Sequence, residues 1–491
     1  MSTLVPDGSR MTTHTTGRPI APPQAITQRL GLILFVCCAG QFLVVLDSSV
    51  VNVALPLIDH SLHLGAGSLH WVVNSYTVVF AGALLLGGRL ADLYGRRRLL
   101  LLGIGLFTLA ALVGGLASNP AILVTARGFQ GLGSAIMAPS TLTVLGTVFT
   151  EPGARARAFG LWSAVAGAGG AVGVLAGGVI AEWFSWRWTL LANVPVGLAL
   201  LALTAVVVPE ASRSRSELRG RVDVVGALAV TLGLMVLVYG VAGASREGWG
   251  SVRTLGLVGL GAALLAFFVL DQAKIASQPL VPLSIFRVRQ VTAANVTALA
   301  CSGALFSSFY FFTLLLQQVL DYSPLETGLA YLPMTAGLFA GARGIAPLVQ
   351  RIGPRPVLIA GHLVSASGLL WLSTAGPDAG FLSALLGPGL LLGVGQGMVM
   401  TALTIAATAD LPYSQSGLAS GLINTTRQLG GAIGLALLVT ISGSRIADRT
   451  AAGQPVREAL ASGYGLAFAT AAGFLALGLL GALAVPARRK A

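Results

Sequence analysis

The chain has 491 residues, of which 55% are hydrophobic and only 10% are charged, whereas charged residues make up about 25% of a soluble domain. So few polar side chains cannot cover so large an apolar core, which excludes a water-soluble globular fold. The formal net charge is +13, but the basic residues stand in short clusters between apolar runs, which excludes a nucleic-acid-binding face. We therefore expect a protein embedded in a lipid bilayer, with no nucleic-acid partner.

Apolar stretches long enough to cross a bilayer recur from residue 30 onwards, since about 20 helical residues cross a hydrocarbon core of about 30 Å. Residues 1–29 are polar and are expected to form a disordered cytoplasmic tail. The pattern predicts an all-α polytopic membrane protein. The fourteen expected spans lie near residues 31–56, 71–88, 99–117, 121–148, 158–181, 188–208, 222–243, 254–271, 290–318, 325–349, 356–374, 380–408, 415–442 and 463–486.

Arginine and lysine residues are distributed unevenly between the two sides that these spans define. Of the 30 basic residues, 21 lie in the tails and even-numbered loops, six in the odd-numbered loops and three within spans. Basic residues concentrate on the cytoplasmic side of membrane proteins. Both termini are therefore expected in the cytoplasm, with the protein in the inner membrane of a bacterium.

An internal repeat relates two parts of the chain. The segment 160–173, which begins Gly-Leu and ends Gly-Gly-Ala-Val-Gly, returns as 421–434, and Gly95 matches Gly353 at a shift of 258 residues. Parallel repeats of this kind predict two six-helix bundles with a substrate site between them. The expected domains are the tail 1–29, an N-terminal bundle 30–208, a cytoplasmic linker with two extra transmembrane helices 209–289, a C-terminal bundle 290–487 and a basic tail 488–491.

The loop after the second span reads GRLADLYGRRR from Gly88 to Arg98. Its two glycines allow a tight turn, and its aspartate can cap the next helix or hold a basic side chain until the halves move. An ordinary basic loop would account for the arginines but not for an aspartate between two glycines. The expected residues of this conformational-switch loop are Gly88, Asp92, Gly95, Arg96 and Arg97.

This loop resembles the signature loop of the major facilitator superfamily. Three further segments narrow the resemblance: LDSSVVNVALP at 46–56, RGFQG at 127–131, and WRW followed by NVPVG at 186–197. Together they resemble the fourteen-helix drug:proton antiporter branch, and the likeness covers residues 30–486. The resemblance implies the major facilitator fold, with two extra linker helices, and proton-driven efflux of drugs or antibiotics.

The fifth span departs from the family pattern. The antiporter signature ends Gly-Pro-x-x-Gly-Gly in the family, whereas this chain reads GVLAGG at 173–178. The proline kink is absent, which bears on the direction of transport. The glycines that permit close helix packing remain, and they are Gly169, Gly173, Gly177 and Gly178.

Asp47 and Arg127 are the strongest candidates for proton coupling, because ionisable residues inside a membrane are costly. Asp47 lies roughly 24 Å from the cytoplasmic side of its span and Arg127 roughly 9 Å from the outer side of its own, so the two depths agree. Burial favours the protonated acid and a nearby arginine favours the carboxylate, so small rearrangements could load and release a proton. A static structural ion pair or helix cap is the open alternative.

Arg427 lies about 12 residues into the thirteenth span, near the midplane, where it faces either the central cavity or a polar partner. An aromatic run that includes Phe309 and Tyr310 could wall the cavity or serve as packing. The expected substrate-cavity residues are Asn52, Phe309, Tyr310, Asn424 and Arg427. Asp47 is the only acid deep within a span, so we expect neutral or anionic apolar substrates, or at most monovalent cations.

Other functional classes lack their required motifs. An ATP-driven pump needs Gly-Lys-Ser/Thr, and neither lysine of the chain follows a glycine. A membrane-embedded enzyme needs a catalytic or metal-ligand cluster, and none stands at membrane depth. We expect a proton-coupled exporter of a small molecule that works as a monomer without ATP, cofactor or metal. A proton-coupled importer (symporter) of the same fold remains the alternative.

Overall fold

The computed structural model describes residues 23–210, 223–277, 279–408 and 413–486, apart from some side chains within them. Every regular element in these ranges is a helix. The expected tails fall largely outside them, as does most of the cytoplasmic linker. Helix α1 begins at Pro23, earlier than the expected end of the tail, because a proline is well tolerated in the first helical turn.

The N-terminal half consists of helices α1 to α8, which pack mainly on one another. Asn119 caps α5, since its side chain accepts a hydrogen bond from the backbone N–H of Ile122. These helices are α1 (Pro23–Leu62), α2 (Ala66–Leu69), α3 (Trp71–Tyr94), α4 (Arg96–Gly115), α5 (Pro120–Val148), α6 (Pro152–Trp183), α7 (Trp188–Leu191) and α8 (Asn193–Val207).

The C-terminal half consists of helices α11 to α17, which also pack mainly on one another. Gly353 joins α13 to α14 with a φ of 86°, and its repeat partner Gly95 joins α3 to α4 with a φ of 99°, a conformation that favours glycine. These helices are α11 (Arg289–Leu314), which continues as a π-helical turn (Leu315–Val319), α12 (Pro324–Ala330), α13 (Leu332–Ile352), α14 (Pro354–Leu372), α15 (Leu386–Thr408), preceded by a second π-helical turn (Phe381–Leu385), α16 (Tyr413–Ala451) and α17 (Val456–Ala484).

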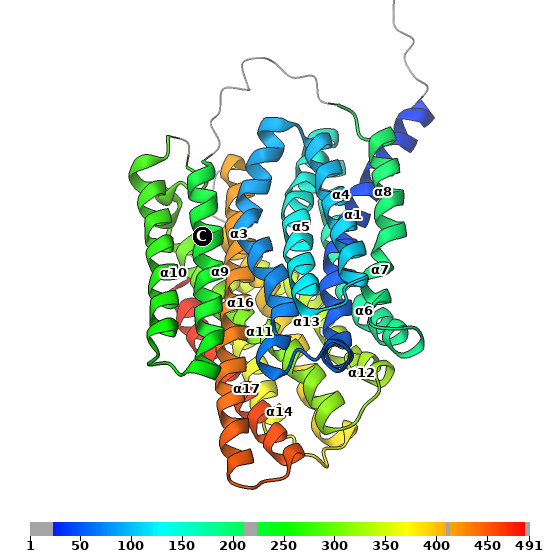
Figure 1. Cartoon of the computed structure of the whole chain (residues 1–491). Helices are drawn as coiled ribbons and strands as arrows, with labels where there is room; N and C mark the ends of the chain where they lie inside the picture. The colour runs from blue at the N-terminus through cyan, green and yellow to red at the C-terminus, as the bar shows by residue number, and fades with distance from the viewer. Residues whose placement is uncertain (1–22, 211–222, 278, 409–412, 487–491) are drawn as a thin grey trace, which may run out of the picture.

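Two further helices, α9 (Val224–Glu247) and α10 (Val252–Leu270), connect the halves in sequence. They stand beside the other helices (Figure 1), and α9 packs against α3 and α16. The contact is apolar, since Val78 of α3, Val230 of α9 and Ala432 of α16 belong to one buried cluster. After α10 the chain forms a π-helical turn (Asp271–Ile275) and a 3₁₀-helix (Leu283–Arg287) before α11.

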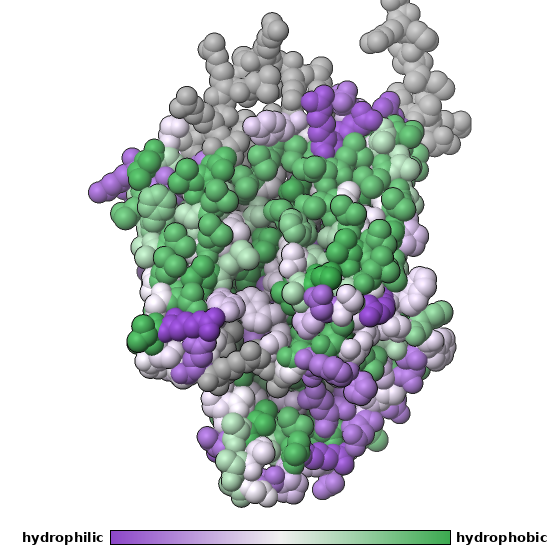
Figure 2. Space-filling model, viewed as in Figure 1, coloured by the Kyte–Doolittle hydropathy of each residue, from purple (hydrophilic) through white to green (hydrophobic). Residues whose placement is uncertain are grey.

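The helices match a membrane-spanning protein. Eleven of those within the described residues are long and apolar enough to cross a bilayer, and hydrophobic residues form a broad belt on the face shown in Figure 2. Each of the fourteen expected ranges contains a helix. The all-α polytopic fold is therefore confirmed, while the number of spans stays a prediction.

The two halves meet closely at one end, which we call the distal end: the end at which α1 finishes at Leu62 and α6 at Trp183. There a Cβ on Gly178 of α6 would lie 2.7 Å from the backbone oxygen of Pro324 in α12. The side chain of Gln317 also donates a hydrogen bond of 2.9 Å to the backbone oxygen of Val53 in α1. These contacts close the distal end between the halves.

Candidate functional site

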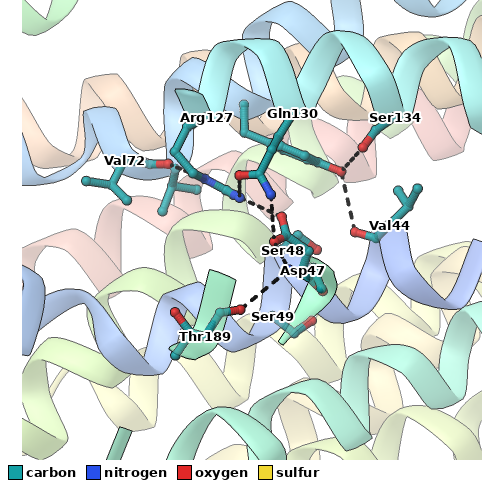
Figure 3. Close-up of polar contacts among 12 residues, drawn as sticks. Val44, Asp47, Ser48, Ser49, Val72, Arg127, Gln130, Ser134 and Thr189 are labelled. Carbon is teal, nitrogen blue, oxygen red and sulfur yellow. Dashed lines mark hydrogen bonds and ion pairs between the residues drawn. The ribbon is translucent and has the colours of Figure 1, made fainter. Parts of the chain in front are cut away.

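Asp47 and Arg127 form a buried ion pair in the N-terminal half. Nη1 of Arg127 on α5 lies 2.5 Å from Oδ2 of Asp47 on α1. The side chains are 1% and 0% exposed, and Figure 3 shows the arginine directed at the carboxylate. The structure therefore brings together the two residues that the sequence placed at matching depths.

Two amide side chains complete the surroundings of the carboxylate. Gln130 donates to Oδ1 of Asp47 at 3.2 Å and accepts from Arg127 at 2.9 Å. Asn193, at the start of α8, donates to the same Oδ1 at 2.8 Å. The carboxylate is thus engaged by three donors, one on Oδ2 and two on Oδ1.

A close approach of α3 to α5 positions the arginine. A Cβ on Gly131 would lie 2.3 Å from the backbone oxygen of Tyr76, so only glycine allows α5 this near to α3. At this separation Nε of Arg127 donates to the backbone oxygen of Val72 at 3.1 Å, and its guanidinium lies 4.6 Å from the centre of the Tyr76 ring. The spacing of RGFQG thus places Arg127 and Gln130 on one face of α5 and a glycine against α3.

The conformational-switch loop lies at the opposite end from the distal contacts. Arg97 donates to the backbone oxygen of Ala205 near the end of α8. Arg97 and Arg98 each lie 3.8 Å from the carboxylate of Glu210. Arg96 begins α4 immediately after the positive-φ glycine. The side chain of Asp92 lies outside the described residues, so its role in switching stays a prediction.

The glycines of the fifth expected span lie at two different helix–helix contacts. A Cβ on Gly169, Gly173 or Gly177 would lie 2.8 to 3.2 Å from atoms of α1, which places α6 tightly against the helix that holds Asp47. Gly178 instead faces α12 of the C-terminal half. The run therefore joins α1, the helix that holds Asp47, to the distal contact between the halves.

The family model described as Major Facilitator Superfamily matches residues 37–435. The chain belongs to the major facilitator superfamily. It is therefore a multi-pass membrane transporter and not an enzyme.

Curated relatives within the superfamily are bacterial resistance and export proteins. The chain is 43% identical to the cephamycin export protein CmcT of Amycolatopsis lactamdurans, over 90% of each chain. It is 39% identical to the puromycin resistance protein pur8 of Streptomyces alboniger, over 90% of this chain and 89% of that one. It is 36% identical to the multidrug resistance protein Stp of Mycobacterium tuberculosis, over 84% and 75% of the two chains. These relatives imply a bacterial membrane.

Solved structures of other transporters share the fold at low sequence identity. A bacterial homologue of the human lysosomal transporter Spinster, in an inward-facing and unoccupied conformation, aligns with a TM-score of 0.64 at 15% identity, over 93% of this chain and 98% of that one. A peptide transporter of the POT type in complex with sulfate aligns with a TM-score of 0.65 at 15% identity, over 91% and 93%. These likenesses establish the major facilitator fold alone.

The structure describes the five expected substrate-cavity residues of this facilitator one by one. Within the described residues no hydrogen bond or ring contact joins any two of them. Asn52 donates to the backbone oxygen of Ser48, one turn earlier on α1. Phe309 stacks on a neighbouring tyrosine, and Tyr310 is 2% exposed and packs edge-on against another ring. Asn424 is half-buried on α16, as is Arg427. Their place in a substrate site stays a prediction.

Sequence reasoning missed Gln130 and Asn193 as partners of Asp47. Both lie in segments quoted for the family resemblance, RGFQG and NVPVG. The signal available was a polar amide inside an apolar span, since a buried amide must find hydrogen-bond partners. That signal indicates a partner but does not say which residue it is.

Proposed function

We propose that this facilitator is a proton-coupled antiporter that exports small, largely apolar molecules, such as drugs or antibiotics, across the bacterial cell membrane. The observation that carries the proposal is the fully buried Asp47 carboxylate, held by Arg127 and by two amides. Ionisable groups buried at membrane depth are rare, and they mark ion and substrate pathways. The printed names of the relatives, which include an export protein and two resistance proteins, support export.

The geometry suggests how proton binding would be coupled to conformational change. Asp47 joins α1 to α5 and α8 while it is ionised. Fewer than two turns further along α1, the backbone oxygen of Val53 bonds Gln317 of the C-terminal half. Protonation of Asp47 would weaken its bonds to Arg127 and Asn193. A resulting shift of α1 would then change the hydrogen bond between Val53 and Gln317 at the distal end. A proton is thus taken up on one side and released on the other as the halves rock.

The direction of coupling decides between this proposal and its alternative. In an antiporter the substrate and the proton bind alternately and cross the membrane in opposite directions. In a symporter they bind together and cross in the same direction. A buried carboxylate beside an arginine serves either mechanism, so the names of the relatives are what favours export over import.

The proposal can be tested by transport in inverted membrane vesicles from cells that express the protein. Puromycin and a cephamycin, which the names of two relatives supply, serve as probes. On imposing an inside-acid proton gradient, we expect uphill accumulation of at least one probe, absent from vesicles without the protein and abolished by a protonophore. Proton-coupled loss of preloaded probe would instead support import.

The proposed orientation places the distal end outside the cell. A cysteine introduced at Ser61, exposed near the end of α1, should react with a membrane-impermeant maleimide in intact cells, and one introduced at Glu151, exposed between α5 and α6, should not. The three native cysteines are buried and are replaced by alanine in the background. Labelling at Glu151 without permeabilisation would overturn the orientation.

A further inference from the structure

Arg427 lies in the C-terminal half and has no counter-ion among the described residues. It lies half-buried on α16, and its Nε is buried with no hydrogen-bond partner. No ion pair to it is present within the described residues. Arg127 in the other half differs in each respect, because it bonds a carboxylate, an amide and a backbone oxygen. Among the described residues, Nε of Arg427 is therefore a buried donor that remains unused.

A second unused donor lies in the same region. Gln396 on α15 is 0% exposed. Its Oε1 accepts a hydrogen bond of 3.1 Å from Sγ of Cys301 on α11. Its Nε2 is buried and has no hydrogen-bond partner. Cys301 lies on α11, which also packs along α16: Thr426, the residue before Arg427, donates a hydrogen bond of 2.8 Å to Asn295 of α11. The two unpartnered N–H donors thus lie on helices that both pack against α11.

The two helices that carry Cys301 and Gln396 offer no acid to neutralise the arginine. Neither α11 nor α15 contains an aspartate or glutamate. The acid on α16, Asp448, lies about 30 Å further along the helix axis. An unpaired charge at membrane depth and a buried, unsatisfied amide are both costly. Their retention is explained if an incoming negatively charged group satisfies both at once.

We propose that Arg427 and Gln396 bind the anionic group of the transported molecule, so that the preferred substrates are apolar monoanions such as aromatic carboxylates. This inference rests on the proposed export function and names its substrate class. A guanidinium presents its N–H groups in a fork that matches the two oxygens of a carboxylate. The amide N–H of Gln396 supplies a further donor, and the apolar helices around it accept the rest of the molecule.

The inference is tested by binding to the purified full-length protein, with 2-naphthoate and 2-naphthamide as probes. The two molecules share a ring system and nearly the same size, and only the first is charged at neutral pH. We expect the wild-type protein to bind naphthoate about tenfold more tightly than naphthamide, because hydrogen bonds to a charged group are the stronger ones. Equal affinity for the two probes would overturn the proposal.

Variants then locate the site. Arg427→Gln should weaken naphthoate binding about tenfold and leave naphthamide binding unchanged, and Gln396→Leu should weaken naphthoate binding by a smaller factor. Arg445→Gln is the matched control, because this arginine also lies on α16 but its Nε already bonds Ser462 at 3.1 Å. Unchanged naphthoate binding in Arg427→Gln contradicts the inference.

If Arg427→Gln does not fold, Arg427→Lys tests the inference instead, because lysine keeps the positive charge but lacks the forked N–H groups of the guanidinium. Its preference for naphthoate over naphthamide should persist at lower naphthoate affinity, and an unchanged naphthoate affinity would overturn the inference. The binding assay needs no proton gradient. Charge-selective binding through Arg427 without proton-driven transport would refute the proposed function alone, and proton-driven transport without charge-selective binding would refute this inference alone.

Discussion

Replacing Asp47 by asparagine should reduce proton-driven accumulation to the level of vesicles without the protein. Asparagine keeps nearly the same shape and one acceptor oxygen for the amides of Gln130 and Asn193, but it cannot bind or release a proton. Exchange of labelled for unlabelled substrate across the membrane, which needs no proton gradient, should persist in this variant. The two assays on the same vesicles separate loss of coupling from loss of folding.

Asp448→Asn provides the matched control, because Asp448 is an exposed acid on α16 and the variant should accumulate substrate as the wild type does. The alternative, a static ion pair, predicts a different outcome. If the pair only holds the helices together, Asp47→Asn should lose exchange and accumulation together, since breaking a buried ion pair costs about 3–5 kcal/mol. Full gradient-driven accumulation by Asp47→Asn would show that another group carries the proton.

Replacing Gly178 by valine should lower transport about tenfold or more by opposing closure of the distal end, since a conformation disfavoured by a few kcal/mol is rarely populated. A Cβ at this position would lie 2.7 Å from the backbone oxygen of Pro324 and 3.2 Å from Cα of Leu325. These are backbone atoms of α12, which cannot move aside as a flexible side chain would. The halves must therefore separate at this end.

The separation can be measured with a cysteine in place of Val53, which is 0% exposed next to the distal contact. In a background without native cysteines, an impermeant maleimide added outside cells should label this cysteine faster in Gly178→Val than in the parent. Gly160→Val is the matched control, because Gly160 lies on the same helix and a Cβ added there would meet nothing within 4 Å. Normal transport by Gly178→Val would contradict the importance of this contact.

The fold could be predicted from the sequence because the membrane simplifies the problem. A spanning segment must satisfy its own backbone hydrogen bonds, so each long apolar stretch is a helix. The repeat that matches Gly95 to Gly353 predicted two six-helix bundles. In the structure both glycines have positive φ and each joins two helices. The start of α1 was less well predicted, because the polar residues after Pro23 continue the helix beyond the apolar stretch.

The candidate site could be predicted only in part. Asp47 and Arg127 were found because charge is rare in apolar spans and because their depths could be compared. Gln130 and Asn193 were missed, since neutral amides give a weaker signal and the choice of partner depends on how α5 and α8 face α1. The same reasoning applies to Gln396, whose pairing with a cysteine on another helix depends on tertiary packing alone.

The sign of proton movement driven by substrate tests the central claim most directly. Proteoliposomes that contain the purified protein and an internal pH-sensitive dye are loaded with a substrate identified in the vesicle assay and diluted into substrate-free buffer, with the membrane potential clamped. Substrate then leaves down its own gradient. Antiport predicts that protons enter and the interior becomes more acidic, and that Asp47→Asn abolishes this change. An interior that becomes more alkaline as substrate leaves would show symport and contradict the proposed function.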